Sequence, residues 1–331
     1  MGRKIQIVML AIVVIVAIGA ATVLPSLADE SSSTGHFTLG NSAPTSLTFT
    51  LYESNESTEA TSMTPQTEYA LKITVTDWNT LNDISEIEVI IKTNSTNIDA
   101  DDSPTDKATY KWTSGGWSLV GPSDSTWNIT DDSRAPSNLN DTTGTWWLHF
   151  IPGKVAREST SGGWDIYVNV TDKGGLSTNN IAGYDMNWYG EISASDTSYS
   201  FGEINLGTTD QGITSPNDGY IDVKTISNGN YKIQSKSDNW QDGNGNTAVL
   251  DWDGNLSSGE FALKVSYQNN VNNSNFVETD YTVITGYESE SGPTAEAGET
   301  KKIYQWISVA DSGLLPGTYS GTFYVQINNN D

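Results

Sequence analysis

Two stretches of strict alternation constrain the fold of this chain more than any other feature. Tyr69–Asp77 (YALKITVTD) and Trp164–Asp172 (WDIYVNVTD) place an apolar side chain at every second position. Successive side chains of a β-strand point to opposite faces of the sheet, so this pattern is typical of a half-buried antiparallel strand. Both stretches end in Thr-Asp before a turn, where a carboxylate can accept backbone N–H groups. They therefore predict two core strands with capped ends.

The same period recurs along the chain, and no stretch after residue 28 has a 3.6-residue apolar period long enough for a sizeable helix. Short strands at regular spacing are typical of β-sandwiches, so we expect an all-β protein. The other expected strands are Ser46–Leu51, Ile87–Lys92, a hairpin over Thr109–Val120, Trp146–Phe150, Asn187–Ile192, Tyr199–Leu206, Tyr220–Ile226, Tyr231–Ile233, Phe261–Tyr267, Asp280–Ile284, Lys302–Val309 and Thr318–Ile327.

The length of 331 residues suits about two domains. Ser193–Ser198 has no apolar anchor and marks the expected boundary. We predict a first β-sandwich over residues 45–192 and a second over residues 199–331. Residues 29–44 are rich in Ser, Thr and Gly, which favours a flexible stalk in front of the first sandwich.

Residues 1–28 have the features of a targeting segment. Arg3 and Lys4 precede a charge-free apolar run from Ile5 to Leu24, and small residues lead up to Ala28 as at a secretory cleavage site. The run is also long enough to span a bilayer, so a retained anchor over residues 5–24 is an alternative to a cleaved signal peptide. Both place the remaining chain outside the cytoplasm, with membrane contact only through residues 5–24 if they are not removed.

The leader also resembles the start of a type IV pilin, with a short basic segment, an apolar helix and Pro25 some twenty residues on. Met9 stands where that family has a glutamate at its fifth mature position. The resemblance keeps a pilus subunit among the alternatives and again implies an extracellular chain.

Charge and cysteine content limit the partners. The chain has 41 acidic and 16 basic residues, a formal net charge of −25, and no cysteine. Nucleic acids and anionic lipids are bound through basic surfaces, so neither is expected as a partner. An acidic surface attracts cations. A secreted chain without disulfides must rest on its apolar core, on metals or on assembly.

Several motifs resemble those of known surface proteins. VTDWNTLNDISEIEV and VNVTDKGGLST are similar to strand–turn motifs of immunoglobulin-like and cadherin-like domains in prokaryotic, particularly archaeal, surface proteins; YSFGEINLG, IDVKTISNGNYKI and LPGTYSGTFYVQI resemble a second such sandwich. The resemblance implies two tandem immunoglobulin-like β-sandwich domains in a structural cell-surface protein: a surface-layer, filament or adhesive component. Its expected partners are other copies of itself or cell-envelope components.

Asp77 and Asp172 also resemble the strand-end aspartates that hold calcium in cadherin-like domains. The other acidic motifs of that family are missing, so capping of a turn is the favoured role for both. The densest polar stretch is Asp242–Glu260, where Asp, Asn and Gly alternate. Its spacing approaches that of an EF-hand loop, which supplies oxygen ligands at positions one, three, five and twelve. The hypothesis is a calcium site formed by Asp242, Asn244, Asn246, Asp251 and Asp253; the alternative is that these are ordinary turn residues.

A carbohydrate-binding module is the alternative function. Adjacent Trp146 and Trp147 must face opposite sides of a strand, so one is a candidate for exposure, and Trp78 and Trp127 lie in a predicted turn and loop. Exposed aromatic patches mark binding surfaces, so these four are the candidate carbohydrate-binding residues.

The seven N-x-[ST] sequons are as many as chance predicts, so only their positions are informative. Asn128 and Asn140 lie in a polar loop, and Asn169 lies on the polar face of its strand, so these three are the expected glycosylation sites. An enzyme is not expected, because the chain has two histidines, no cysteine and none of the common catalytic strings.

Overall fold

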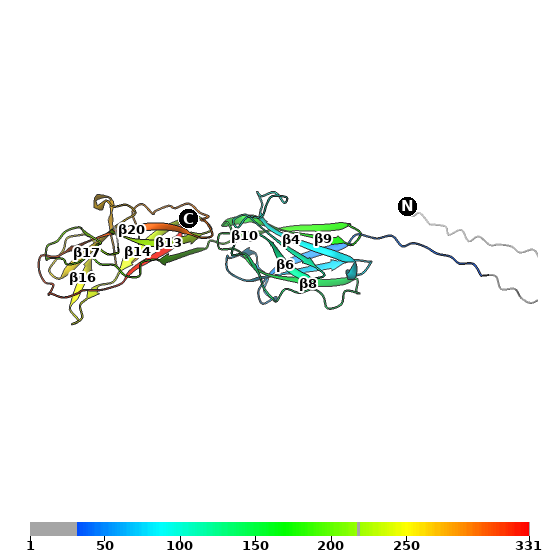
Figure 1. The fold of residues 1–331 in the computed structure, drawn as a ribbon, viewed down its shortest axis with the longest axis horizontal. Helices are drawn as coiled ribbons and strands as arrows, with labels where there is room; N and C mark the ends of the chain where they lie inside the picture. Colours follow the sequence, from blue (N-terminus) through cyan, green and yellow to red (C-terminus); the bar gives the residue numbers. More distant parts are fainter. Residues whose placement is uncertain (1–31, 217–218, 331) are drawn as a thin grey trace, which may run out of the picture. The chain divides into compact units, whose positions relative to one another are not determined.

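The computed structural model describes residues 32–216 and 219–330, and in these ranges the protein is all-β (Figure 1). Two apolar cores form in succession, each between its own pair of sheets. Short 3₁₀ turns occur at Leu81–Asp83 and Val271–Asn273. None of the helical segments described is long and apolar enough to cross a membrane. The expected targeting segment, residues 1–28, lies outside the described residues.

One sheet of the first sandwich has the strand order β1-β3-β8-β7. Its antiparallel register places Ile73 between Phe49 on one neighbour and Trp146 on the other. The strands are β1 (Ser46–Glu53), β3 (Tyr69–Thr76), β8 (Thr143–Ile151) and β7 (Asn128–Ile129).

The facing sheet has the order β2-β10-β9-β4-β5-β6. Its strands are β2 (Ser62–Met63), β10 (Ser177–Met186), β9 (Ser159–Asp172), β4 (Ile84–Thr93), β5 (Lys107–Thr113) and β6 (Gly116–Gly121). The first sheet has four strands, and the facing sheet has β10, β9 and β4 at its centre with three additional strands, β2, β5 and β6, at its sides. Two sheets facing each other across one apolar core form a β-sandwich, which confirms the expected all-β fold class for the first half.

The alternation identified the buried face of this sandwich correctly. Leu71, Ile73 and Val75 of β3 are fully buried, as are the apolar residues of β9 from Trp164 to Val170. Aromatic rings fill the space between the sheets; Trp112 meets Trp146 edge to face with ring centroids 5.3 Å apart. Rings bury large apolar areas and compensate for the absence of disulfides.

The second sandwich pairs a large sheet with a small one. The large sheet has the order β11-β13-β20-β17-β16-β15, and the small sheet has β19-β14-β21. The large-sheet strands are β11 (Gly190–Ala194), β13 (Tyr220–Ser227), β20 (Glu299–Val309), β17 (Glu260–Ser266), β16 (Thr247–Asp251) and β15 (Trp240–Gln241), with β12 (Gln211–Gly212) and β18 (Asn275–Phe276) added. The small-sheet strands are β19 (Thr282–Val283), β14 (Tyr231–Ser237) and β21 (Phe323–Asn329).

Two strand predictions need correction. The expected last strand of the first domain, Asn187–Ile192, contributes to β11, which pairs with β13 of the second sandwich from Gly190 to Ala194. Alternation over so few residues does not reveal which sheet a strand joins. Tyr199–Leu206 forms no strand and has a single isolated bridge at Ser200; Tyr199 and Phe201 pack instead against the second core. The aromatic alternation there reflected core contacts and not a sheet.

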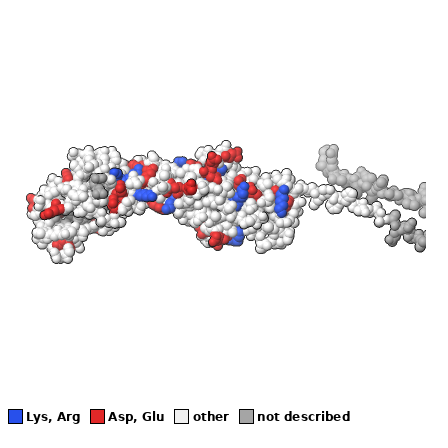
Figure 2. All heavy atoms as spheres, in the orientation of Figure 1, with Lys and Arg blue, Asp and Glu red and all other residues white. Residues whose placement is uncertain are grey.

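The surface is charged but not uniformly so. Figure 2 shows acidic and basic side chains interspersed on the face in view, with uncharged areas between them. The longest uncharged stretch of the second sandwich lies between Asp311 and Asp331, and it contains β21.

Candidate metal centre

The predicted calcium loop is a pair of capped turns. Asp242 accepts backbone N–H groups of Asn244 and Asn246 at 2.9 and 2.8 Å, and its second oxygen accepts the Asn246 amide at 2.7 Å. The side-chain hydrogen bond from Asn246 is the largest cause that lowers the pKa of Asp242. Its charge is therefore already stabilised by local donors.

The other two predicted carboxylates serve a second turn. Asp251 accepts the backbone N–H groups of Asp253 and Gly254, and Asp253 accepts that of Asn255. In the ranges the structure describes, two groups of acidic residues or histidines bring three ligand atoms together, and neither contains Asp242, Asp251 or Asp253. The calcium hypothesis for this loop stays a prediction.

Burial removes two of the four candidate tryptophans from any binding surface. Trp127 is 3% exposed, packs on Trp164 and donates its indole N–H to the Pro104 carbonyl at 2.9 Å. Trp146 is fully buried. Trp146 has the same parity along its strand as Leu148 and Phe150, so the sequence already contained the signal that it faces the core.

The other two tryptophans differ from each other. Trp78, in the turn after β3, is 69% exposed. Trp147 is half-buried on the outer face of the sheet, beside Tyr52 and with the Arg134 guanidinium 5.2 Å and the Lys72 ammonium 5.8 Å from its ring centroid. The Lys72 and Arg134 cations lie over the ring of Trp147, so this ring has little free surface on which a sugar could stack.

The expected glycosylation sites all lie on the outside of the first sandwich. Asn128 and Asn140 are exposed, and Asn169 is half-buried, with its amide 3.4 Å from the Thr171 hydroxyl. Their use stays a prediction.

Three aspartates meet at the end of the first sandwich where the alternating strands β3 and β9 finish. Asp77 follows β3, Asp172 ends β9, and Asp83 ends the 3₁₀ turn Leu81–Asp83. One carboxylate oxygen from each lies within 4.8 Å of the others. Pairing of β4 with β9 brings Ile84 opposite Asp172, and this holds Asp83 at the cluster. The sequence identified Asp77 and Asp172 as strand-end aspartates, but it did not indicate Asp83.

The hydrogen bonds around these carboxylates leave one oxygen without a partner. Asp77 accepts the backbone N–H of Asn79 at 2.8 Å, but its Oδ2 is buried and has no hydrogen-bond partner among the described residues. Asp172 accepts the N–H of Leu176 at 2.8 Å and the amide of Asn41 at 2.9 Å. Asp77 is fully buried and Asp172 is 1% exposed. A buried carboxylate oxygen without a partner is costly, because it has lost its water.

The electrostatics of the cluster are unfavourable without a counter-ion. Burial raises the pKa of Asp77; the Asn79 N–H opposes this, and the nearby charges of Asp83 and Asp172 add to it. None of the ion pairs formed by the described residues involves these aspartates. Either a proton or a cation would relieve this repulsion.

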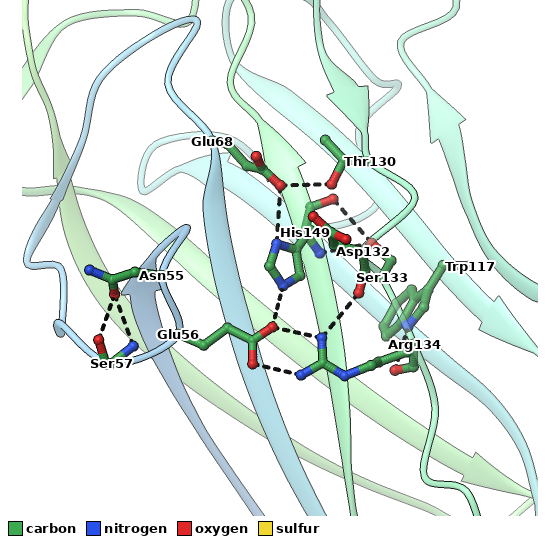
Figure 3. A network of polar contacts seen from close by, with 10 residues as sticks. All are labelled: Asn55, Glu56, Ser57, Glu68, Trp117, Thr130, Asp132, Ser133, Arg134 and His149. Atoms are coloured by element: carbon green, nitrogen blue, oxygen red, sulfur yellow. Dashed lines mark hydrogen bonds and ion pairs between the residues drawn. The ribbon is translucent and has the colours of Figure 1, made fainter.

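The second group of three possible ligands, Glu68, Asp132 and His149, belongs to a network of hydrogen bonds on the outer face of β8 (Figure 3). In this network the His149 side chain, which is 2% exposed, lies between Glu56 and Glu68. Its ring nitrogens are 2.9 and 3.0 Å from their carboxylates. Arg134 holds both oxygens of Glu56 at 2.6 Å, and its hydrogen bond is the largest cause that lowers the Glu56 pKa.

Ionised carboxylates only accept hydrogen bonds, so a His149 ring nitrogen that carries a hydrogen donates it to the carboxylate beside it. A metal at the group Glu68, Asp132 and His149 would have to displace one of these bonds. The network therefore fits a structural role better than metal binding, in contrast to the aspartate cluster.

Comparisons with known proteins add no family. No family model matches this chain, and no curated protein matches it. One similar solved structure is named BspA_C_mut; it shares 8% sequence identity at a TM-score of 0.27, with 87% of this chain and 96% of that chain covered. A similarity this low supports no argument about fold or function.

Proposed function

We propose that this chain is an extracellular structural protein of the cell surface, in which tandem immunoglobulin-like sandwiches form a surface-layer, filament or adhesive component. The observation that carries the proposal is the succession of two apolar cores behind a basic-apolar leader. Domains of this kind hold a chain at a distance from the membrane or build an assembly, and their rigidity comes from the sheets.

Immunogold labelling of intact cells that make the protein, followed by fractionation of their envelopes, tests this location. Label on the outer surface and recovery with the envelope are expected. Recovery of the protein from the cytoplasmic fraction of intact cells would overturn the proposal.

A second proposed function is binding of a divalent cation, for which calcium is the best candidate, by Asp77, Asp83 and Asp172. The specific support is the unpartnered, fully buried Oδ2 of Asp77 in a cluster of like charges. Calcium takes oxygen ligands at 2.3–2.6 Å, so two ligands on opposite sides of the ion are about 4.8 Å apart. The three carboxylate oxygens lie within 4.8 Å of one another, so one such ion is within reach of all three.

A calcium titration by calorimetry, with melting curves in calcium and in chelator, tests the site. A ligand that binds only the folded state stabilises it by about 2.7 kcal/mol at a hundredfold excess over its Kd. We expect the melting temperature of the first sandwich to rise with calcium and Asp77→Asn to abolish the rise.

The matched control is Asp131→Asn, which removes the same charge from an exposed position of the same sandwich. It should retain the calcium response. An equal rise of the melting temperature with calcium in wild type and in Asp77→Asn would overturn the proposed site. A rise that is lost only in Asp242→Ala would show that calcium binds in the loop of the second sandwich.

A further inference from the structure

The small sheet of the second sandwich ends in a strand with one neighbour. In the order β19-β14-β21, β21 pairs only with β14, from Tyr231 opposite Asn329 to Ser237 opposite Phe323. The corresponding strand of the first sandwich, β9, lies between β4 and β10. Among the residues described in the second sandwich, none pairs with the other side of β21 as β10 pairs with β9; β11 lies close to β21, with Gly190 beside Ile327, but pairs with β13 of the other sheet.

The core is incompletely covered beside this edge. Phe323, Val325 and Ile327 of β21 pack against the second core but are only half-buried. On the neighbouring strand, Tyr231 and Ile233 are fully buried, although Ile233 lies directly opposite Ile327. An additional strand beside β21 would bury the exposed parts of its three apolar side chains.

The edge also lacks the usual protection against pairing. Edge strands are commonly blocked by lysine, proline, a bulge or shortness. β21 has seven residues in regular register, and no proline or charged residue occurs between Pro316 and Asp331. In a chain of net charge −25, another copy can approach such an uncharged edge without strong repulsion.

The chain contains a segment with the pattern of a strand and no sheet. Over Thr34–Gly40 the apolar Phe37 and Leu39 alternate with His36 and Thr38, which is typical of a strand with one buried face. The segment has no strand partner, and Phe37 and Leu39 are 88% and 78% exposed. No aspartate, glutamate, lysine or arginine lies between Glu30 and Glu53, so this segment, like β21, is uncharged apart from any charge on His36.

The segment cannot reach β21 of its own chain. Asn41 is held at Asp172, whereas Asn329 at the end of β21 donates to Glu158, before the start of β9. The regular part of β9 from Trp164 to Asp172 alone spans roughly 26 Å. Phe37 lies four residues before Asn41 and therefore extends at most roughly 14 Å from it.

We propose that Thr34–Gly40 of one copy docks as an added strand on β21 of a second copy, with Phe37 and Leu39 facing the incompletely covered core. Strand addition gains affinity from main-chain hydrogen bonds and specificity from alternate side chains. Donor and acceptor are different surfaces of the chain, so the contact is heterologous and links copies head to tail, into an open filament unless the rotation between copies closes a ring. This deepens the proposed structural function and rests on it, since it identifies the partner as the protein itself.

Two other strand edges, those of β10 and β1, offer less apolar surface to an added strand. The exposed length of β10 includes the polar Asn179 and Asn180, and Asn180 already bonds to the Leu47 carbonyl. On β1, the inward-facing Leu47 and Leu51 are already buried, and only Phe49 is half-buried, compared with three such side chains on β21. An added strand would gain little apolar burial on either.

Variants of the donor test the proposal without risk to folding, because the altered side chains are exposed. The full chain with Phe37→Asp and Leu39→Asp is compared with the full chain with His36→Asp and Thr38→Asp, by sedimentation and electron microscopy. Both pairs add two negative charges to the same segment, and the apolar leader is unchanged. We expect the first pair to weaken self-association more than about tenfold and the second to weaken it much less, because only the first removes the buried face.

Directed cross-linking tests the acceptor. The chain has no cysteine, so Thr38→Cys in one preparation and Gln326→Cys in another can form a disulfide only between copies. Mixing them should give a covalent dimer that a peptide of residues 33–41 suppresses and the same peptide with both apolar residues replaced by Asp does not. As a matched control, Thr38→Cys mixed with Ser177→Cys on β10 should give no such dimer.

Equal association of the two donor variants, or cross-linking that the peptide does not affect, would overturn strand docking. Either result would leave the location of the protein at the cell surface unaffected, so the two proposals fail separately.

Discussion

The first sandwich has a strand on each side of its central β9, whereas the corresponding strand of the second, β21, has one paired neighbour among the described residues. Both cores are built from alternating residues, and both bury aromatic rings. The difference lies in closure: the inward-facing residues of β9 are fully buried, and those of β21 are half-buried. Alternating apolar residues are thus enough to form a core, but the number of strands in the sheet decides whether the inward-facing side chains are fully buried.

The largest expected effects test whether the two cores are independent. Trp164→Ala in the first sandwich and Phe261→Ala in the second each remove a buried ring and should cost about 3–5 kcal/mol. Chemical denaturation should show that each variant shifts only the unfolding transition of its own sandwich. Trp78→Ala, at an exposed ring, is the control and should change stability by less than about 0.5 kcal/mol. A common shift of both transitions would show that the sandwiches unfold as one unit.

The next largest effect is the loss of stability on truncating a side chain of β21, which measures how far this edge strand is covered. Ile233 on β14 and Ile327 on β21 lie opposite each other, so they form a matched pair that differs in burial. Ile233→Ala should cost about 2–5 kcal/mol and Ile327→Ala roughly half as much, since a half-exposed side chain loses less on truncation. The measurement is denaturant unfolding of the chain whose donor segment carries Phe37→Asp and Leu39→Asp. Equal costs there would mean that β21 is already covered.

How far the sequence predicts this molecule depends on whether a feature is local. The inward faces of β3 and β9 follow from alternation, and the paired Trp112 and Trp117 confirm the hairpin expected around Gly115. Strand membership is not local, because β11 pairs with β13 only through tertiary packing. The parity of Trp146 was available in the sequence, and counting it against Leu148 would have placed this ring in the core.

The candidate metal centre shows the same limit. Two of its aspartates stand at the ends of strongly predicted strands, but the third comes from a 3₁₀ turn with no periodic signal. The clustered Asp and Asn of the second sandwich gave the stronger sequence signal, yet their side chains cap turns within a few residues. Spacing along a chain indicates ligands only when the loop does not use them for its own hydrogen bonds.

A third prediction concerns how the stability of the first sandwich depends on pH, because the pKa of Asp77 is raised in the folded protein. Its neutral form is favoured by folding, so its contribution to stability is present below its ordinary pKa of 3.8 and is lost as pH rises through the raised value. In chelator, Asp77→Asn should therefore make the first sandwich more stable than wild type at neutral pH, and calcium should reduce this difference. Melting curves at several pH values measure it, and Asp131→Asn is the control. A loss of stability in Asp77→Asn at neutral pH in chelator would contradict the interpretation.

The smallest expected effect is the opposite pH response of the second sandwich, where hydrogen bonds from Asn246 and Asn244 lower the pKa of Asp242. A lowered folded pKa contributes stability above the ordinary value of 3.8, and that contribution is lost as pH falls through the lowered value. Asp242→Ala should therefore lower the melting temperature of the second sandwich at neutral pH, and the difference from wild type should shrink in acid. Calcium should not change that difference, because the Asn246 amide already holds the Asp242 oxygen that calcium would need. If calcium enlarges the difference in melting temperature between Asp242→Ala and wild type, the ion binds in this loop. In that case the hydrogen bonds within the turn do not keep calcium from Asp242, and the two sandwiches no longer differ in the way that Asp242 and the unpartnered Asp77 suggest.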